Sequence, residues 1–332
     1  MNSITVIIPT YNEEKYIAHC IESIIKQDFP KDKLEVFFVD GCSTDKTREI
    51  INEYSKKNSY ISFLLNTKKY VPYAMNYGIS KAKGEYIIRL DAHAYYPPSY
   101  FTTLINSALE LRADNVGAIQ RTEVLNKKKK SIAIKEVLMN RFGVGNSYFR
   151  IGSEKVLEVD TVPFGCFKRE VFDKIGFYDE RLIRNQDIEL NKRLKKSGGR
   201  IYLIPTISYT YYARENFKAL SKNNFLNGYW NILTVYYTKN IGSISIRHFI
   251  PLLFVLSIIL PIFGSFFYLP FIYLALFSMT LYLVFFIGLS AKISLSKKVN
   301  FSYLLFAFVT LHISYGIGSI TGMLKLPFLK KS

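Results

Sequence analysis

The sequence predicts an α/β domain with a mostly parallel sheet, followed by interfacial and transmembrane helices. Short apolar runs alternate with helical patterns over the first part of the chain, which is typical of a parallel sheet covered by helices on both faces. After Glu215 the chain contains ten basic residues and no acidic one. This last part also carries apolar segments of about 20 residues, the length that a helix needs to cross a hydrocarbon core.

Strand and helix patterns alternate clearly over the first hundred residues. The predicted strands cover residues 4–8, 34–39, 61–65 and 86–90. Helices are expected after the first three strands, with Ser43 or Thr44 capping the second helix and Pro72 opening the third. Ligands of such sheets bind beyond the carboxyl ends of the strands, so the polar residues there are the first candidates for a site.

The stretch from residue 98 to 215 has a mixed pattern. Helices are expected over residues 100–111, 168–175 and 187–196, strands over residues 116–120 and 201–204, and a strand or turn over residues 160–167. The last strand is expected to end before Pro205, because proline cannot donate to a sheet ladder. Lys127–Lys130 is a run of four basic residues, which indicates a solvated loop or a segment that holds lipid headgroups. We assign residues 1–215 to the first domain.

The rest of the chain is expected to associate with a membrane. Residues 216–248 hold a basic, aromatic helix that lies in the membrane interface or packs against the first domain. Residues 249–332 form a transmembrane region with apolar segments at 249–268, 271–290 and 301–324. The first two segments predict a hairpin of two spans. The third spans the membrane or forms a re-entrant or interfacial helix, because lysines flank both its ends.

Charge and cysteine content limit the partners. A net charge of +18 and a pI near 9.5 suit contact with an anionic membrane surface. Nucleic acid is the competing partner, and we disfavour it because the basic residues lie beside apolar runs without a nucleic-acid-binding motif. Three scattered cysteines and the lack of a signal-peptide pattern predict free thiols and a cytosolic first domain.

Polar segments follow the first two predicted strands. The first segment comprises Pro9, Thr10, Tyr11, Asn12 and Glu13. Its backbone amides and polar side chains can hold a nucleoside; a plain strand-to-helix turn capped by Asn12 is the alternative. After the second strand, the Asp40 carboxylate can accept hydrogen bonds from a base N–H or a ribose hydroxyl. Helix capping explains Ser43 and Asp45 in the same segment, but it does not explain Asp40.

Two further candidates lie later in the chain. Asp91 and His93 flank Ala92 at the end of the fourth strand, where alternate side chains point the same way and can meet one divalent ion. A purely structural role is the alternative for so short a motif. Gln186 and Asp187 open a predicted helix, where a carboxylate can act as a general base or simply compensate the helix dipole.

Together these segments resemble family 2 glycosyltransferases with the GT-A (Rossmann-like) fold. The resemblance covers residues 4 to about 205 in the family's order. The matching segments are 6–13 (opening strand and nucleotide loop), 39–45 (uridine-binding segment), Asn76 to Ile79, Gly84 to Ile87, Asp91 to His93 (in place of D-x-D), Gly165 to Glu180, and Gln186-Asp187 (in place of a Glu-Asp pair). Residues 211–214, 227–230 and 312–316 are similar to membrane glycosyltransferases of bacterial exopolysaccharide assembly, of the succinoglycan type.

The resemblance implies an inverting transfer from a UDP-sugar to a lipid-diphosphate-linked saccharide at the cytosolic face of the cell membrane. Asp187 would be the base, and Asp91 with His93 would bind manganese or magnesium. The residues implied on the nucleotide-sugar side are Pro9, Thr10, Tyr11, Glu13, Asp40, Asn76, Asp91 and Ala92. The residues implied on the acceptor and diphosphate side are Gly165, Gln186, Arg214 (or the nearby Lys222) and Trp230, whose ring stacks on an acceptor sugar or lies at the membrane interface.

Three positions depart from the family pattern: Gly41 and Gln186 replace acidic residues, and His93 replaces a metal-binding aspartate. Imidazole is a poorer magnesium ligand than carboxylate, so manganese is the expected preference. Two other functions stay open. One is a polyprenyl-phosphate glycosyltransferase, which uses a lipid monophosphate acceptor. The other is a non-catalytic membrane scaffold that binds nucleotide-sugar.

Overall fold

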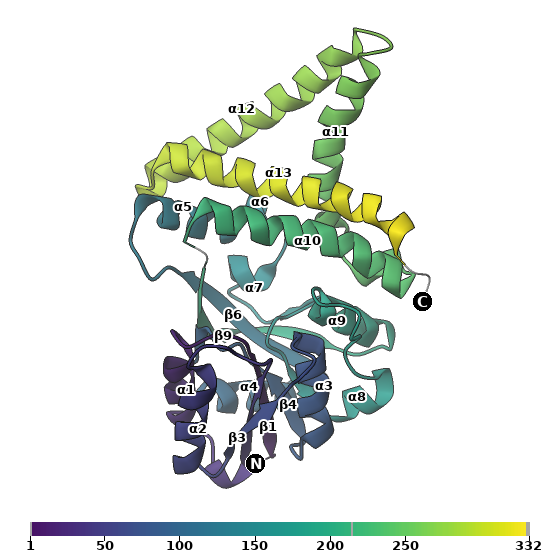
Figure 1. The fold of residues 1–332 in the computed structure, drawn as a ribbon. Coiled ribbons are helices and arrows are strands. Elements are labelled where there is room, and N and C mark those ends of the chain that lie inside the picture. Colours follow the sequence, from purple (N-terminus) through teal and green to yellow (C-terminus); the bar gives the residue numbers. More distant parts are fainter. Residues whose placement is uncertain (1, 214, 330–332) are drawn as a thin grey trace. The chain divides into compact units, whose positions relative to one another are not determined.

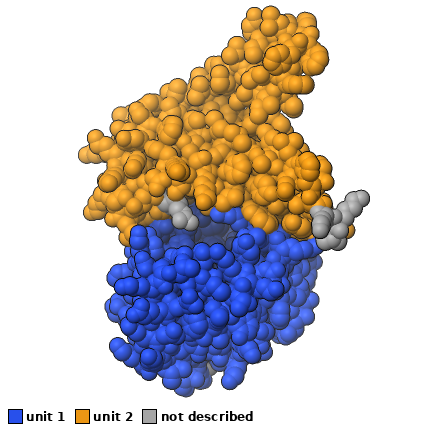
Figure 2. Space-filling model, in the orientation of Figure 1, with its two compact units in different colours: residues 1–121, 148–212 blue, residues 122–147, 213–332 orange. Residues whose placement is uncertain are grey.

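A computed structural model describes residues 2–213 and 215–329 (Figure 1). The chain forms two compact units (Figure 2): unit 1 comprises residues 1–121 and 148–212, and unit 2 comprises residues 122–147 and 213–332. The chain therefore passes between the units three times. These units do not follow the boundary expected at residue 215, because the segment 122–147 clusters with the C-terminal helices.

Unit 1 is built on a mixed sheet with the strand order β3-β2-β1-β4-β8-β6-β9-β5, and β7 also pairs with β9. The strands are β1 (Ile4–Thr10), β2 (Leu34–Asp40), β3 (Ile61–Leu65), β4 (Tyr86–Arg89), β5 (Ala94–Tyr95), β6 (Asn115–Glu123), β7 (Leu157–Glu158), β8 (Cys166–Lys168) and β9 (Ile201–Tyr212). The pairs β1–β2, β1–β4 and β2–β3 are parallel, as expected. The later pairs β4–β8, β6–β8 and β5–β9 are antiparallel, so the sheet is parallel only in its first half.

Helices cover both faces of this sheet. One apolar core lies under α1 (Ile17–Ile25), α2 (Thr47–Lys57) and α4 (Tyr100–Glu110). The other lies under α3 (Val71–Lys81), α8 (Glu170–Ile175) and α9 (Gln186–Lys196). Strands buried on both faces need continuous apolar runs, and for this reason the sequence pattern finds them.

Two local expectations are wrong. Helix α2 begins at Thr47 and has no side-chain cap, so neither Ser43 nor Thr44 caps it. Strand β9 does not end before Pro205 but continues to Tyr212. Pro205 is tolerated because it falls between the part of β9 that pairs with β7, at residues 202–203, and the part that pairs with β5, at residues 210–211.

Unit 2 is mainly helical, with the last two residues of β6 at its start. Its helices include α5 (Lys129–Leu138), α6 (Arg141–Val144), α10 (Phe217–Thr238), α11 (Ile250–Gly264), α12 (Phe271–Lys297) and α13 (Phe301–Lys325). The charge run Lys127–Lys130 is thus not only a loop, because its last two residues open α5. The apolar face of α5, with Ala133 and Ile134, packs into one core with Phe308 of α13.

Three segments of the described chain are long and apolar enough to cross a membrane: Ile246–Gly264, Phe271–Lys297 and Phe301–Phe328. They indicate membrane association. The first two segments are only 17% and 11% buried in the structure, whereas the third is 50% buried. Figure 1 shows why, since α13 lies along α10 while the α11–α12 hairpin extends away from both. The expected helical hairpin is confirmed, and α13 differs from it in being packed along α10.

Close contact between α10 and α13 depends on glycine. A Cβ added to Gly318 would collide with the backbone carbonyl of Phe225, and one added to Gly228 would collide with the carbonyl of Tyr315. Small residues let helix backbones approach in this way, and such contacts are typical of helices in membranes.

We expect Gly318→Ala to lower the melting temperature of the detergent-solubilised protein. Overpacking costs about 1–3 kcal/mol, and the neighbouring atoms here are backbone atoms that cannot turn aside. Gly288→Ala is the matched control, because nothing lies within 4 Å of the added Cβ in α12 and alanine favours a helix by about 1 kcal/mol over glycine. Equal melting temperatures for the two variants would contradict this packing.

Candidate active site

The loops that follow β1 and β2 are held together by hydrogen bonds. The Asn12 side-chain oxygen accepts from the Thr44 amide at 2.8 Å, and the Asn12 amide donates to the Ser43 hydroxyl at 2.9 Å. The Glu13 amide donates to the Thr47 hydroxyl at 2.7 Å. Asn12 therefore does not cap α1, whose first turn has no side-chain cap. The two predicted nucleotide loops form one rigid edge of unit 1.

Asp40 lies at the base of this edge and is fully buried. Its carboxylate accepts from the Ser43 amide at 2.9 Å and from the Ser43 hydroxyl at 2.5 Å. No surface of Asp40 is open to a base or a ribose in this structure, so the direct contact expected from the sequence is not supported. Packing explains why a glycine stands at position 41, because a Cβ there would collide with the carbonyl oxygen of Lys69.

Tyr11 and Asn12 are exposed in the first loop and Glu13 is half-buried, but Asn12 is tied to the second loop by its hydrogen bonds. The Tyr11 ring is 39% exposed, and the Lys69 ammonium lies 4.2 Å from its centroid. An exposed ring beside a cation offers a flat face and a charge to a nucleotide. Pro9 is a strand residue of β1, and Thr10 is buried with its hydroxyl 3.4 Å from Asp40. These two residues therefore belong to the framework that supports the loop.

His93 and Asp91 come together at the end of β4, as predicted, while Ala92 between them is buried. His93 Nε2 lies 4.0 Å from the Asp91 carboxylate, and His93 Nδ1 lies 3.1 Å from Glu13. Burial opposes the charged form of His93, but the hydrogen bond to Glu13 and the charge of Asp91 outweigh it and raise the pKa to about 10. Without a metal, His93 is therefore a cation between two carboxylates.

The arrangement is compatible with a metal only in part. Neighbouring ligands of one ion, each about 2.0–2.2 Å from it, lie roughly 3–3.5 Å apart, so Asp91 and His93, at 4.0 Å, would have to approach slightly to share one. Glu13 on the other ring nitrogen would orient the imidazole, as a carboxylate hydrogen-bonded to a metal-bound histidine does. The described residues, however, contain no group of three or more His, Cys, Asp or Glu side chains that could hold an ion. A metal here would need oxygen ligands from a bound diphosphate or from water.

Arg89 is a site residue that the sequence analysis missed. Its guanidinium is buried at the end of β4 and lies 3.7 Å from Asp91 and 3.8 Å from Asp187. Its Nε and Nη1 atoms have no hydrogen-bond partner in the described structure. Arg89 precedes Asp91 by two positions, so strand alternation gave a signal that could have found it.

Asp187 opens α9, as predicted, and is 30% exposed. One carboxylate oxygen accepts from the Ile188 amide at 3.0 Å, and the other faces Arg89. Gln186 beside it is buried, and its side-chain oxygen has no hydrogen-bond partner in the described structure. Arg89 thus joins the predicted base to the predicted metal ligand within unit 1.

The other predicted residues lie apart from this cluster or serve the fold. Asn76 accepts from the Tyr178 amide and donates to the Tyr178 carbonyl, so it ties α3 to the loop before α9. Gly165 is buried against Asn115, where a Cβ would clash. Trp230 belongs to α10 in unit 2, and Arg214 lies outside the described residues.

We expect Asp40→Ala to destabilise unit 1 rather than to act only on donor binding. Leaving the buried Ser43 donors unsatisfied costs about 1–3 kcal/mol, which thermal unfolding measures. Asp32→Ala, at an exposed position, is the matched control. If the Asp40→Ala protein kept its melting temperature but bound the nucleotide more weakly, the result would support a direct contact between Asp40 and the nucleotide.

Comparisons with known proteins show the family of the chain. A family model described as glycosyl transferase family 2 matches residues 5–176. The dolichyl N-acetyl-α-D-glucosaminyl phosphate 3-β-D-2,3-diacetamido-2,3-dideoxy-β-D-glucuronosyltransferase of Methanococcus voltae is 32% identical, over 71% of this chain and 78% of that protein. The succinoglycan biosynthesis protein ExoA of Rhizobium meliloti is 30% identical, over 74% of each chain.

A solved structure supports the same fold. The mannosyltransferase PcManGT of Pyrobaculum calidifontis, in complex with GDP-Man and Mn2+, superposes with a TM-score of 0.61 over 97% of this chain and 87% of its own. At 15% identity this likeness shows the GT-A fold alone. The family model covers more than half of the chain, and the relative from Methanococcus voltae covers most of it. The chain therefore belongs to glycosyl transferase family 2 and is a glycosyltransferase.

Proposed function

We propose that this enzyme transfers a sugar, with inversion, from a nucleotide-sugar to a lipid-linked saccharide during assembly of a cell-surface glycan. The names of its relatives describe a dolichyl-linked phosphate substrate and succinoglycan biosynthesis, and the three apolar helices suit an acceptor that stays in the membrane. The observation that carries the proposal is the pairing of Asp187 and Asp91 on the Arg89 guanidinium.

Asp187 is the proposed base. It lies at the start of α9, where the helix dipole is positive, and the Ile188 amide and Arg89 hold its carboxylate in place. In the proposed step, the acceptor hydroxyl gives its proton to Asp187 while its oxygen forms a bond to the anomeric carbon. The bond from that carbon to the diphosphate oxygen breaks, and the electron pair leaves with the nucleoside diphosphate. Inversion follows because this is a single displacement.

The leaving group is the proposed partner of the Asp91–His93 pair. A bound divalent ion would neutralise the charge that develops on the diphosphate. Asp91 and His93 would hold the ion, with Glu13 fixing the imidazole through Nδ1. Manganese suits a mixed oxygen and imidazole set better than magnesium. Tyr11 and Lys69 are the proposed contacts for the nucleotide, which we expect to be UDP.

The acceptor and the topology are further parts of the proposal. We place the catalytic unit at the cytosolic face of the cell membrane and assign a lipid-diphosphate-linked saccharide as the acceptor. A lipid monophosphate is the second candidate, because the name of one relative describes a phosphate-linked dolichyl substrate. Transfer assays with matched monophosphate-linked and diphosphate-linked acceptors separate the two. Gln186, Trp230 and Arg214 remain candidate acceptor residues.

We expect Asp187→Asn to fold normally and to bind the donor as the wild type does, yet to lose transfer by about 10²–10⁴-fold, the usual value of general-base assistance. The amide keeps the size and the capping ability of the carboxylate but removes its basicity. Donor binding is measured by thermal stabilisation with a panel of UDP-sugars and GDP-sugars. Near-normal turnover would place the base elsewhere, and Glu189 would be the next candidate.

We expect transfer to need a divalent ion and His93→Ala to weaken donor binding in the presence of manganese. His93→Gln is the matched comparison, because an amide keeps some hydrogen bonding to Glu13 but is a weak metal ligand. The readout is the manganese-dependent shift in melting temperature with the donor bound. Full activity of the wild type in excess chelator would refute the metal requirement.

A further inference from the structure

The lysine run Lys127–Lys130 of unit 2 has no part in the proposed transfer chemistry. Its last two residues open α5, and the apolar face of α5 packs into one core with the starts of α10 and α13 and with Phe286 and Ile293 near the end of α12. Figure 1 shows these helix ends gathered around α5. The run therefore lies close to the end of a segment, Phe271–Lys297, that is long and apolar enough to cross a membrane.

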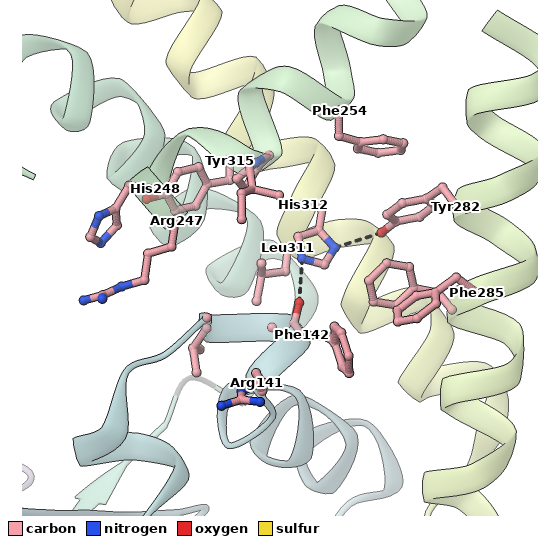
Figure 3. Close-up of a pocket in the computed structure, with 16 residues that line it drawn as sticks. Arg141, Phe142, Arg247, His248, Phe254, Tyr282, Phe285, Leu311, His312 and Tyr315 are labelled. Carbon is pink, nitrogen blue, oxygen red and sulfur yellow. Dashed lines mark hydrogen bonds between the residues drawn. The ribbon is translucent and has the colours of Figure 1, made fainter. Parts of the chain in front are cut away.

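Two further contacts fix the segment that carries the run. Glu136 of α5 forms an ion pair with Lys297 of α12 at 2.6 Å. In the following helix, α6, the Phe142 carbonyl accepts a hydrogen bond from His312 Nε2 at 2.9 Å, and His312 Nδ1 accepts from the Tyr282 hydroxyl at 2.9 Å (Figure 3). These contacts join α5 and α6 to α12 and α13, so the lysines hold set positions beside the end of α12.

Other lysines lie around the same core. Lys218 is in the first turn of α10, and Lys292 and Lys298 lie at the end of α12. These side chains and most of the run are exposed. We define the basic face of unit 2 by its lysines: Lys127, Lys128, Lys129, Lys130, Lys218, Lys292 and Lys298.

Acidic side chains do not neutralise the basic face. The acidic residues of unit 2 are Glu123, Glu136 and Glu215. Glu123 and Glu136 pair with Lys135 and Lys297, which are not part of the basic face. The Glu215 carboxylate accepts from a backbone amide at 2.8 Å. Within the described ranges, no acidic side chain pairs with a lysine of the basic face, so its charge is available to a partner.

Exposed aromatic rings lie beside the basic face. Phe306 and Tyr303, near the start of α13, are 53% and 39% exposed. Phe217, next to Lys218 in α10, packs edge-on against Phe306 with ring centroids 4.7 Å apart. Aromatic rings mixed with lysines are typical of protein segments at the level of lipid headgroups.

The end of α12 indicates which anionic partner the basic face meets. From residue 271 to residue 291 this helix has no charged side chain, and lysines follow at once with Lys292. A lysine at the end of an apolar span lies at the level of the headgroups, which its long stem reaches. Clusters of about four to eight basic residues beside a span attract anionic lipids. Nucleic acid also binds basic surfaces, but it gives no role to the exposed apolar helix that ends there.

We infer that the basic face binds the headgroups of anionic phospholipids and thereby sets the level of unit 2 at the membrane surface. Helix α5 then lies along the membrane interface, with its apolar face on α13 and its lysine run on the headgroups. This inference goes beyond the proposed function and does not depend on it, because no lysine of the basic face takes part in the proposed transfer step.

The test measures binding of dansyl-labelled phosphatidylglycerol to the full-length protein in a neutral detergent. Energy transfer from Trp230, the single tryptophan of the chain and part of α10, reports the bound lipid. Dansyl-labelled phosphatidylcholine, which has no net charge, is the reference lipid. We expect the wild type to prefer phosphatidylglycerol by about tenfold or more at low salt. This preference should largely disappear in 1 M NaCl, where the Debye length is about 3 Å.

The variant Lys127→Gln/Lys128→Gln/Lys129→Gln/Lys130→Gln removes the charge of the run, and glutamine keeps the helix propensity of lysine at the start of α5. We expect its affinity for phosphatidylglycerol to fall by about tenfold, because each basic residue near an anionic surface adds to the attraction. Its affinity for phosphatidylcholine should not change. The variant K127R/K128R/K129R/K130R keeps the charge and should bind as the wild type does.

The matched control is Lys56→Gln/Lys57→Gln/Lys81→Gln/Lys83→Gln, which removes the same charge from exposed positions of unit 1. It should bind phosphatidylglycerol as the wild type does. An equal loss of binding in the control and in the glutamine variant of the run would overturn the inference, because net charge alone would then explain the effect.

Three other results would overturn the inference. The wild type could bind both lipids equally, or its preference for phosphatidylglycerol could persist unchanged in 1 M NaCl; neither result depends on the folding of a variant. The glutamine variant could also bind phosphatidylglycerol with wild-type affinity. Tighter binding of a single-stranded RNA than of phosphatidylglycerol at the same salt would assign the basic face to nucleic acid instead.

Discussion

The buried guanidinium of Arg89 is the interaction on which the candidate site depends. Asp91 follows a parallel strand and Asp187 opens a helix nearly a hundred residues later, yet both carboxylates lie within 4 Å of this one cation. A buried cation is costly unless an opposite charge compensates it, so the guanidinium needs a carboxylate beside it. The guanidinium therefore holds the Asp91 and Asp187 carboxylates at a set spacing.

The second constraint is the hydrogen bonding between the loops after β1 and β2. Asn12, Glu13 and Ser43 use their backbone or side-chain groups across the two loops instead of capping the helices that follow. This arrangement leaves Tyr11 exposed and places the Glu13 carboxylate against His93. A rigid edge of this kind is pre-organised for a ligand, because little conformational entropy is left to lose on binding.

The sequence predicted most elements of the first half of unit 1 because their strands are buried on both faces and read as unbroken apolar runs. It also predicted that Asp91 and His93 meet, since strand alternation is a local rule. It could not predict that Asp40 is buried under Ser43, or that Arg89 reaches Asp187, because both depend on contacts distant in the chain. Helix α5 was not predicted, because the lysine run at its start indicates a solvent-exposed segment. Its apolar face packs against α13, which lies far downstream in the sequence.

The crossing of the chain between the two units affects how the protein folds during synthesis. Residues 122–147 leave the ribosome before β9, which completes the sheet of unit 1, and well before α13, which covers Ala133 and Ile134 of α5. The apolar face of α5 thus stays open while almost half of the chain is still being made. Such a face is exposed to aggregation during that interval. Chaperone contact or early adsorption of α5 to the membrane surface would protect it, and loss of α13 would leave α5 and α10 without the helix that they pack against.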